Sequence, residues 1–306
     1  MEWLQTTNML VAISSGLVTI LVAVLAWRRH SKSRQSDADA APVSVLTVRF
    51  IALFEAHGVH RNQIPEFFDH GLTLADVSSY QSLLEKLSPQ ILSDAAELFA
   101  VELEWLQGAT VKVYPTHEFY KQPEEFDVFV DELLSRGNRL RGCVFNTEHP
   151  NNDASEYDAL IMITEEVGHA NDRPVFRIHL CNHWGFKYWR SRAYLAACIA
   201  IAWRKNLCLI GKQTPPKWLI PFAEGKALIS YNYDDGFLRY PSLSTWYADE
   251  LVDTPAKFLK GIESRDQGLA LSKWLKLDEQ GHMEMYEDGS HTAVRTAYGE
   301  ALAELE

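Results

Sequence analysis

The chain has 306 residues, of which 47% are hydrophobic and 11% aromatic. This composition can bury a substantial core in about two domains and excludes an intrinsically disordered protein. The formal net charge of −12 at pH 7 repels phosphate and anionic lipid headgroups, so binding to nucleic acid would need a local basic patch. The cysteines have no CxxC spacing, which favours free thiols in a reducing compartment such as the cytoplasm: Cys143, Cys181, Cys198 and Cys208.

The first predicted element is a transmembrane helix over residues 9–27, an uncharged run long enough to cross a hydrocarbon core of about 30 Å. Only Glu2 precedes the run, whereas four basic residues follow it closely: Arg28, Arg29, Lys32 and Arg34. By the positive-inside rule, residues 1–8 lie outside and the bulk of the chain is cytoplasmic. The sequence therefore predicts a single-pass protein of the bacterial inner membrane, held in the lipid bilayer through residues 9–27.

The next 17 residues, 28–44, combine this basic flank with a small, polar stretch that is typical of a flexible tether. From 45 to 109 the apolar residues recur at helical spacing, with breaks at Gly58, Gly71 and before Pro89. That periodicity predicts a small all-α bundle of four or five short helices.

The end of this bundle, residues 91–108, reads ILSDAAELFAVELEWLQG. Its residues match a closing pattern of the form A-x-x-L-G-V-x-x-x-W-L-x-G at Ala95, Phe99, Val101, Leu103, Trp105, Leu106 and Gly108. Residues 45–109 therefore resemble helix-turn-helix domains of the phage-repressor (Xre) type. The resemblance implies that residues 49–58 and 60–68 form the first two helices and that residues 74–83 form the helix that enters the major groove.

Several features of residues 45–109 depart from the DNA-binding members of that family. Ala100 stands where the family has glycine, and Pro65 interrupts the second helix. The segment contains three basic and nine acidic residues, a net charge of −6. We therefore expect a degenerate module that binds an unidentified protein partner, with DNA binding as the disfavoured alternative. The predicted DNA or partner contacts are Arg61, Asn62, Gln63, Ser78, Ser79 and Gln81.

After residue 109 the pattern changes to short β-type runs, such as LRGCVF, YDALIMIT and PVFRIHLCN. A helix is predicted over 124–135, and a second helix contains the wholly apolar segment 193–202. Residues 110–262 are thus expected to form an α+β sensing or docking domain, and residues 263–306 an acidic C-terminal tail. The predicted fold class is an N-terminal transmembrane helix, then a small all-α helix-turn-helix-like bundle and an α+β domain.

One strand run carries potential metal ligands, because alternation places His179, Cys181 and His183 on one face together with Arg177. Neighbours at i and i+2 lie about 7 Å apart in a strand, too far for three adjacent ligands of one ion. A half-exposed strand with a polar outer face explains the pattern more simply. We therefore expect no cofactor and no metal.

An enzyme in the α+β domain is a less favoured alternative, and its catalytic residues are unknown. Asp158, Glu165 and Glu166 accompany a hydrophobic strand, as in acid-containing nucleases. However, the next strand supplies Arg177-Ile178-His179 where those enzymes need Glu-x-Lys. The chain also lacks a Gly-x-Ser-x-Gly elbow and a phosphate-binding loop.

Aromatic and arginine side chains gather where the polar strand meets the apolar helix. Such a mouth could bind an anion or an aromatic ligand, although the same side chains could simply pack the helix against the sheet. The candidate ligand or partner surface is Arg177, Trp184, Tyr188, Trp189, Arg190 and Arg192. The expected function is that of a membrane-anchored regulatory or adaptor protein acting through protein–protein interaction; the alternatives are a membrane-tethered, DNA-binding transcription regulator and an enzyme or metal-binding protein.

Overall fold

A computed structural model describes residues 42–147, 158–232, 237–238, 244–286 and 289–305. Residues 47–306 form one compact unit, separate from the residues before 47.

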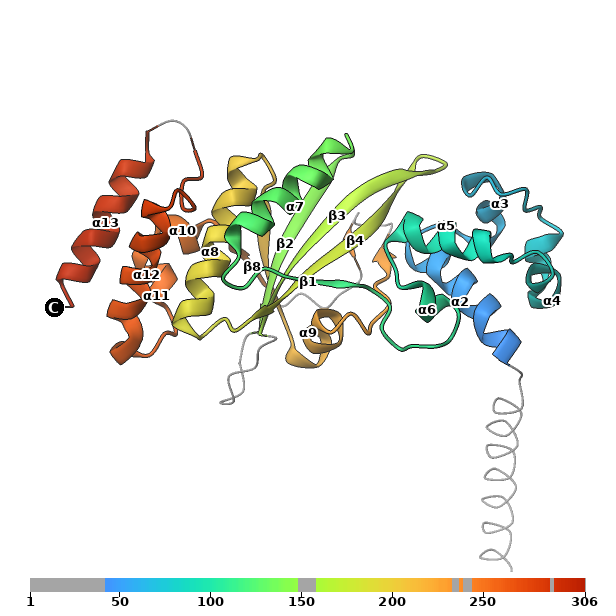
Figure 1. The fold of residues 1–306 in the computed structure, drawn as a ribbon, viewed down its shortest axis with the longest axis horizontal. Coiled ribbons are helices and arrows are strands. Elements are labelled where there is room, and N and C mark those ends of the chain that lie inside the picture. The colour runs from blue at the N-terminus through green and yellow to red at the C-terminus, as the bar shows by residue number, and fades with distance from the viewer. Residues whose placement is uncertain (1–41, 148–157, 233–236, 239–243, 287–288, 306) are drawn as a thin grey trace, which may run out of the picture. The chain divides into compact units, whose positions relative to one another are not determined.

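A six-stranded mixed sheet lies at the centre of the unit (Figure 1), with strand order β1-β4-β3-β2-β5-β8. Strands β2, β3 and β4 are antiparallel neighbours, β1 is parallel to β4, β5 is parallel to β2, and β8 is antiparallel to β5. The strands span Thr116–Glu118 (β1), Leu140–Thr147 (β2), Ala159–Ala170 (β3), Arg173–Trp184 (β4), Leu209–Thr214 (β5) and Ser244–Tyr247 (β8). A separate two-stranded sheet pairs β6 (Tyr231–Asn232) with β7 (Phe237–Leu238).

The predicted fold class was wrong, because the strands and helices form an α/β arrangement around this mixed sheet. Helix α8 (Trp189–Arg204) carries the chain from β4 across the sheet to β5, which lies beside β2 and parallel to it. A parallel pair needs such a crossover, whereas an antiparallel pair can be joined by a hairpin. The run of apolar residues in a buried strand does not reveal which of the two pairings it makes.

No helix among the described residues is long and apolar enough to cross a membrane. Even the extensively buried α8 has 16 residues, which corresponds to roughly 24 Å of helix, less than a hydrocarbon core of about 30 Å. Its apolar sides pack against protein. This finding contradicts the predicted single-pass fold class, the transmembrane character and the inner-membrane localisation. The predicted span 9–27 lies outside the described residues.

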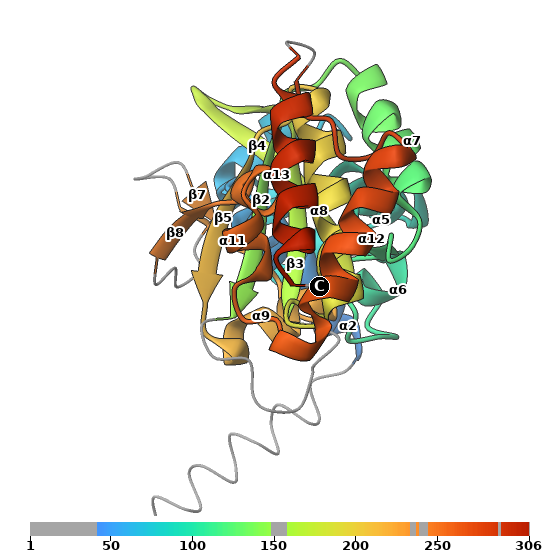
Figure 2. The same cartoon turned by 90° about the vertical axis from the view of Figure 1, so that its left-hand side faces the viewer.

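Helices α7 (Pro123–Ser135) and α8 lie side by side against one face of the sheet, and α12 (Gln267–Glu279) and α13 (His291–Ala303) pack beyond α8 (Figures 1 and 2). Helix α7 begins with proline at its first position and buries Phe126, Val130 and Leu133, which recur at helical spacing. Five of the buried core residues of α8 are alanines, whose small side chains let the helix be covered on most sides. Helix α9 (Pro216–Ala223) contacts β2, β3 and β4.

The residues before β1 form a series of short helices around an aromatic core of Phe50, Phe54, Phe68 and Phe99, with ring centroids 4.9–6.2 Å apart along the chain of contacts. The region predicted as one groove-entering helix over 74–83 is instead a 3-10 turn followed by the five-residue α4. The elements are α2 (Pro42–Ala56), η1 (Arg61–Gln63), α3 (Ile64–Phe67), η2 (Asp76–Ser78), α4 (Tyr80–Leu84), α5 (Pro89–Phe99) and α6 (Leu103–Leu106).

Local chemistry explains both ends of α5. The Ser88 hydroxyl accepts a hydrogen bond from the Ile91 amide at 3.2 Å, which caps the first turn. The helix ends at Ala100, whose φ of 52° lies in the left-handed region, and glycine is the residue that adopts this conformation most easily. The position where the repressor family has glycine is thus a real left-handed helix end occupied by alanine.

Two further helices follow β8 and lead to the C-terminal region: α10 (Glu250–Asp253) and α11 (Pro255–Leu259). The residues expected as an acidic tail include α12 and α13, and Trp274 of α12 stacks on Tyr298 of α13 with ring centroids 3.7 Å apart. Both rings are buried in the same core as α8.

Gly211 in β5 offers a test of how tightly the sheet packs at β8. A Cβ atom at this position would lie 2.2 and 2.4 Å from two carbons of the Trp246 indole and 2.6 Å from the Trp246 carbonyl oxygen. We expect Gly211→Ala to lower the free energy of unfolding, measured by urea denaturation, by about 1–3 kcal/mol, because the clash involves backbone as well as side chain.

The matched control is Gly299→Ala in α13, where an added Cβ would meet nothing within 4 Å. This change is expected to raise the free energy of unfolding by up to about 1 kcal/mol, since alanine favours helix over glycine. Equal urea midpoints for the two variants would contradict the packing described here.

Candidate functional site

A pocket of about 430 Å³ lies at the carboxyl ends of the parallel strands β2 and β5. Asn146 and Thr147 end β2, Gln213 lies near the end of β5, and Trp246 comes from the adjacent β8. From β2 the chain continues to β3 on one side, whereas β5 lies on the other side. In open α/β sheets, ligands commonly bind outside the carboxyl ends of strands at such a divergence.

The rest of the pocket wall comes from the loop after β4 and from helices α8, α10 and α11. Strand β4 runs in the same direction as β2, so its end and the start of α8 lie at the same edge of the sheet. The Gly185 amide donates to the Ser191 hydroxyl at 3.0 Å, which fixes this turn and places Arg192 in the first turn of α8. The lining residues from these elements include Phe186, Lys187, Arg192, Glu250, Lys257 and Lys260.

Positive charge predominates in the pocket, although the chain as a whole is acidic. Four basic residues line it, Lys187, Arg192, Lys257 and Lys260, against the single described carboxylate of Glu250. The Lys257 ammonium donates to the Glu250 carboxylate at 2.8 Å, so this pair is largely neutralised. The remaining excess of cations gives the pocket an electrostatic preference for anions.

Arg192 is the most constrained of these cations, with only 1% of its surface exposed. Its guanidinium donates to the carbonyl oxygens of Phe186, Phe258 and Lys260 at 2.5, 3.0 and 3.4 Å, and it lies 3.8 Å from the Phe186 ring centroid. No carboxylate of the described residues forms an ion pair with it. Burial lowers the pKa of Arg192 to about 9, so the side chain still carries its charge at neutral pH.

Three of the lining residues have a buried polar atom that finds no hydrogen-bond partner among the residues that the structure describes: Asn146 (Oδ1), Thr147 (Oγ1) and Trp246 (Nε1). Asn146 and Thr147 are only 7% and 5% exposed. A buried polar group without a partner typically costs about 1–3 kcal/mol, so each one calls for an explanation such as a bound water or ion. Their grouping in one pocket indicates a surface shaped for a polar ligand.

The predicted ligand surface is only partly brought together. Arg192 lines the pocket, but Trp184 is buried in the core, where its indole N–H donates to the Cys181 carbonyl at 3.0 Å. The rings of Tyr188 and Trp189 contact each other edge to face, and the Arg190 guanidinium lies 4.9 Å from the Trp189 ring centroid.

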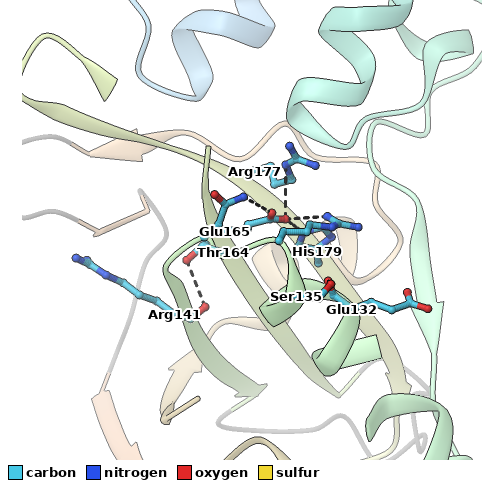
Figure 3. Close-up of polar contacts among 9 residues, drawn as sticks. Glu132, Ser135, Arg141, Thr164, Glu165, Arg177 and His179 are labelled. Atoms are coloured by element: carbon cyan, nitrogen blue, oxygen red, sulfur yellow. Dashed lines mark hydrogen bonds and ion pairs between the residues drawn. The ribbon is translucent and has the colours of Figure 1, made fainter. Parts of the chain in front are cut away.

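Arg177 belongs to a different cluster, centred on the buried carboxylate of Glu165 in β3 (Figure 3). Glu165 accepts hydrogen bonds from Asn138 at 2.7 Å, His179 at 2.9 Å and Arg136 at 3.0 Å, and the Arg177 Nε lies 3.6 Å away. Burial alone would raise the pKa of Glu165, but the hydrogen bonds from His179 and Asn138 and the charges of Arg177 and Arg136 hold it at about 2. This cluster compensates its buried charge internally.

The three metal candidates meet different surroundings. His179 is bonded to Glu165, whereas Cys181 is completely buried in the apolar core, where burial raises its thiol pKa far above the usual range. His183 is partly exposed, with a positive φ of 67°. In the part of the chain that the structure describes, no group of three or more His, Cys, Asp or Glu side chains could hold a metal ion.

The predicted DNA or partner contacts lie on η1, η2 and α4, and most of them make local hydrogen bonds. The Arg61 Nε donates to the Val77 carbonyl, and its guanidinium lies 5.0 Å from the Tyr80 ring centroid. Gln63 accepts from the His60 amide at 3.0 Å, and the Ser79 hydroxyl accepts from the Ser82 amide at 3.1 Å. Three others are exposed, Asn62, Ser78 and Gln81; the Ser78 hydroxyl donates to Ala75 O, and the Gln81 amide to Glu85.

Comparison with protein-family models found no match, and neither curated proteins nor solved structures gave a significant match. The resemblance of residues 45–109 to the repressor-type helix-turn-helix domains stays a prediction.

Sequence reasoning missed most of the pocket, because its residues come from positions between 146 and 261 that meet only through the parallel pairing. One available signal was the pair Lys257 and Lys260, two cations just before the acidic C-terminal region. The predicted mouth at the start of the apolar helix did include Arg192, the buried cation of the pocket wall.

The Glu165 cluster gives a prediction about acid stability. The pKa of Glu165 is about 2 in the folded protein and about 4.5 in the unfolded chain. Its carboxylate therefore contributes stability above about pH 4.5, and this stability is lost as the pH falls toward 2. Glu165→Gln is expected to lower the free energy of unfolding at pH 7 by about 2–3 kcal/mol and to flatten its dependence on pH between these values. Urea denaturation at a series of pH values measures both effects.

The adjacent Glu166 provides the control, since among the described residues its carboxylate pairs only with the exposed His169, at 3.4 Å. Glu166→Gln is expected to change the free energy of unfolding by less than about 1 kcal/mol. A similar small change for Glu165→Gln would show that the buried cluster adds no stability.

Proposed function

We propose that the chain is a regulatory binding protein. In this proposal the pocket at β2, β5 and β8 holds a small anionic ligand, and the helical module, residues 45–109, binds a protein partner. The single observation that carries the ligand is Arg192, a buried guanidinium that bonds to carbonyl oxygens and lies over the Phe186 ring beside the pocket lysines. A ligand anion would supply the counter-charge that this side chain does not receive from a described carboxylate.

The magnitudes favour Arg192 as the main determinant of anion binding. Two unit charges about 4 Å apart attract by about 4 kcal/mol at an effective dielectric constant of 20, before desolvation is subtracted. Exposed lysines contribute much less, typically about 0–1 kcal/mol, because water and salt screen them. Lys257 and Lys260 would therefore steer the ligand and add to its affinity, while Arg192 holds it in place.

The proposal that the helical module binds a protein is supported by its charge and by its internal bonds. Its acidic excess disfavours phosphate, and Arg61, the best basic candidate for a DNA contact, already bonds to Val77 and Tyr80. Leu74 is 64% exposed and Tyr80 is 47% exposed, so apolar surface is available next to this segment. For the enzyme alternative, Glu165 and His179 are buried and bonded to each other, which leaves them poorly placed for a substrate.

Anion binding can be tested by isothermal titration calorimetry with pyrophosphate, citrate and ATP. We expect at least one of these probes to bind, with an affinity that falls as salt is raised. The double variant Lys257→Glu, Lys260→Glu should weaken the binding at least tenfold, because it reverses two charges of the pocket wall.

The matched control is the double variant Lys217→Glu, Lys226→Glu, which makes the same charge change at exposed positions that do not line the pocket. It should retain most of the affinity. The proposal is wrong if none of the three probes binds at millimolar concentration, or if both double variants lose binding equally.

The role of Arg61 gives a separate prediction. Arg61→Ala is expected to lower the free energy of unfolding by about 1–2 kcal/mol, because it removes the hydrogen bond to Val77 and the contact with Tyr80. Arg265→Ala, at a pair whose arginine is 78% exposed, should be nearly neutral in the same urea assay.

The same preparations test the DNA alternative. The wild-type protein is expected to give no mobility shift with duplex DNA at low salt. A shift that disappears both with salt and in Arg61→Ala protein of normal stability would instead favour the DNA-binding regulator.

A further inference from the structure

We infer that the anion held in the pocket is a nucleotide, that is, a phosphorylated ligand that also carries a heteroaromatic base. This inference rests on the proposed anion binding and goes further by assigning the chemical class of the ligand. It is carried by the kind of polar atom left without a partner in the pocket wall, and by the aromatic side chains beside them.

The first step concerns hydrogen-bond polarity. Asn146 Oδ1 is an acceptor, so its missing partner must be a donor, whereas the Trp246 indole N–H is a donor and needs an acceptor. Thr147 Oγ1 can take either role. A fully ionised phosphate or carboxylate group presents only acceptors, so such a group leaves Asn146 without its donor. The edge of a nucleobase presents donors and acceptors next to each other.

The second step concerns the aromatic wall. Phe186 and Trp246 both line the pocket, and their rings contact each other with centroids 5.8 Å apart at 66°. Phe186 also carries the Arg192 guanidinium on its face. The buried cation and the indole are thus both in contact with one phenyl ring. This neighbourhood fits a ligand with a planar ring close to its anionic group, because aromatic side chains stack readily on nucleobases.

The third step concerns size and charge. A volume of about 430 Å³ is in the range of pockets that hold single small molecules. A longer nucleic acid would extend beyond the pocket over a chain whose formal net charge is −12, which repels a continuous phosphate backbone. The geometry therefore points to a free nucleotide and not to RNA or DNA.

The experiment compares the four ribonucleoside 5′-monophosphates with ribose 5-phosphate and pyrophosphate by isothermal titration calorimetry on the full chain. Ribose 5-phosphate has the same phosphate and sugar without the base. At least one of the four nucleotides is expected to bind at least tenfold tighter than ribose 5-phosphate.

Two variants locate the base. Trp246→Phe removes the indole N–H while keeping an aromatic ring, and Thr147→Val removes the hydroxyl while keeping the branched shape. Each should weaken binding of the preferred nucleotide about fivefold or more and leave binding of ribose 5-phosphate unchanged. Thr147→Val should not lower the thermal midpoint of the ligand-free protein appreciably, since its hydroxyl has no hydrogen-bond partner among the described residues. Trp246→Phe also removes indole carbons that pack against Gly211, so some loss of thermal midpoint is expected and the affinities are compared below it.

Trp203→Phe is the matched control, because Trp203 in α8 also has a buried indole N–H without a partner but does not line the pocket. It should bind the nucleotide as the wild-type protein does. Equal affinities for the nucleotides, ribose 5-phosphate and pyrophosphate would overturn the nucleotide inference while leaving anion binding intact. Failure of every probe to bind would overturn both.

Discussion

The burial of helix α8 between the sheet and α12 is the constraint on which the other features depend. Its alanine-rich surface allows the helix to contact the sheet and α12 at once, and from it the chain returns to the far side of β2. There strand β5 pairs in parallel with β2, and the pocket lies at their carboxyl ends. The same helix carries Arg192 in its first turn, so packing and charge in the pocket have a common origin.

The sequence predicts single elements well but not the contacts between residues that lie far apart in the chain. Helical periodicity and a favourable proline suffice for α7, and a long apolar run suffices for α8. The pairing of β5 with β2 could not be predicted, because strand direction leaves no mark on the composition of a buried strand. Consequently Arg192 is recognisable as a candidate for anion binding, whereas Asn146 and Trp246, which join it only through the strand pairing, are not. Glu165 was noticed as an acid on a strand, but its partners could only be found once β3, β4 and the turn after α7 were placed together.

Two buried charges, Glu165 and Arg192, have different surroundings. Glu165 receives hydrogen bonds and positive charges from four side chains, which is sufficient to keep it ionised. Arg192 receives only carbonyl oxygens and an aromatic face, which solvate the guanidinium without neutralising it. A compensated charge of the first kind strengthens the fold, while a charge of the second kind retains a capacity to attract an anion. This contrast separates an internal cluster from a binding site on physical grounds.

The position of the Trp246 indole in the pocket wall depends on Gly211 having no Cβ atom. Because β5 has no side chain there, the Trp246 indole can lie directly over the neighbouring backbone and face Phe186. Any larger residue would displace the indole, and with it one wall of the pocket. The stability of the sheet edge and the shape of the pocket wall therefore depend on the same methyl-sized space beside β5.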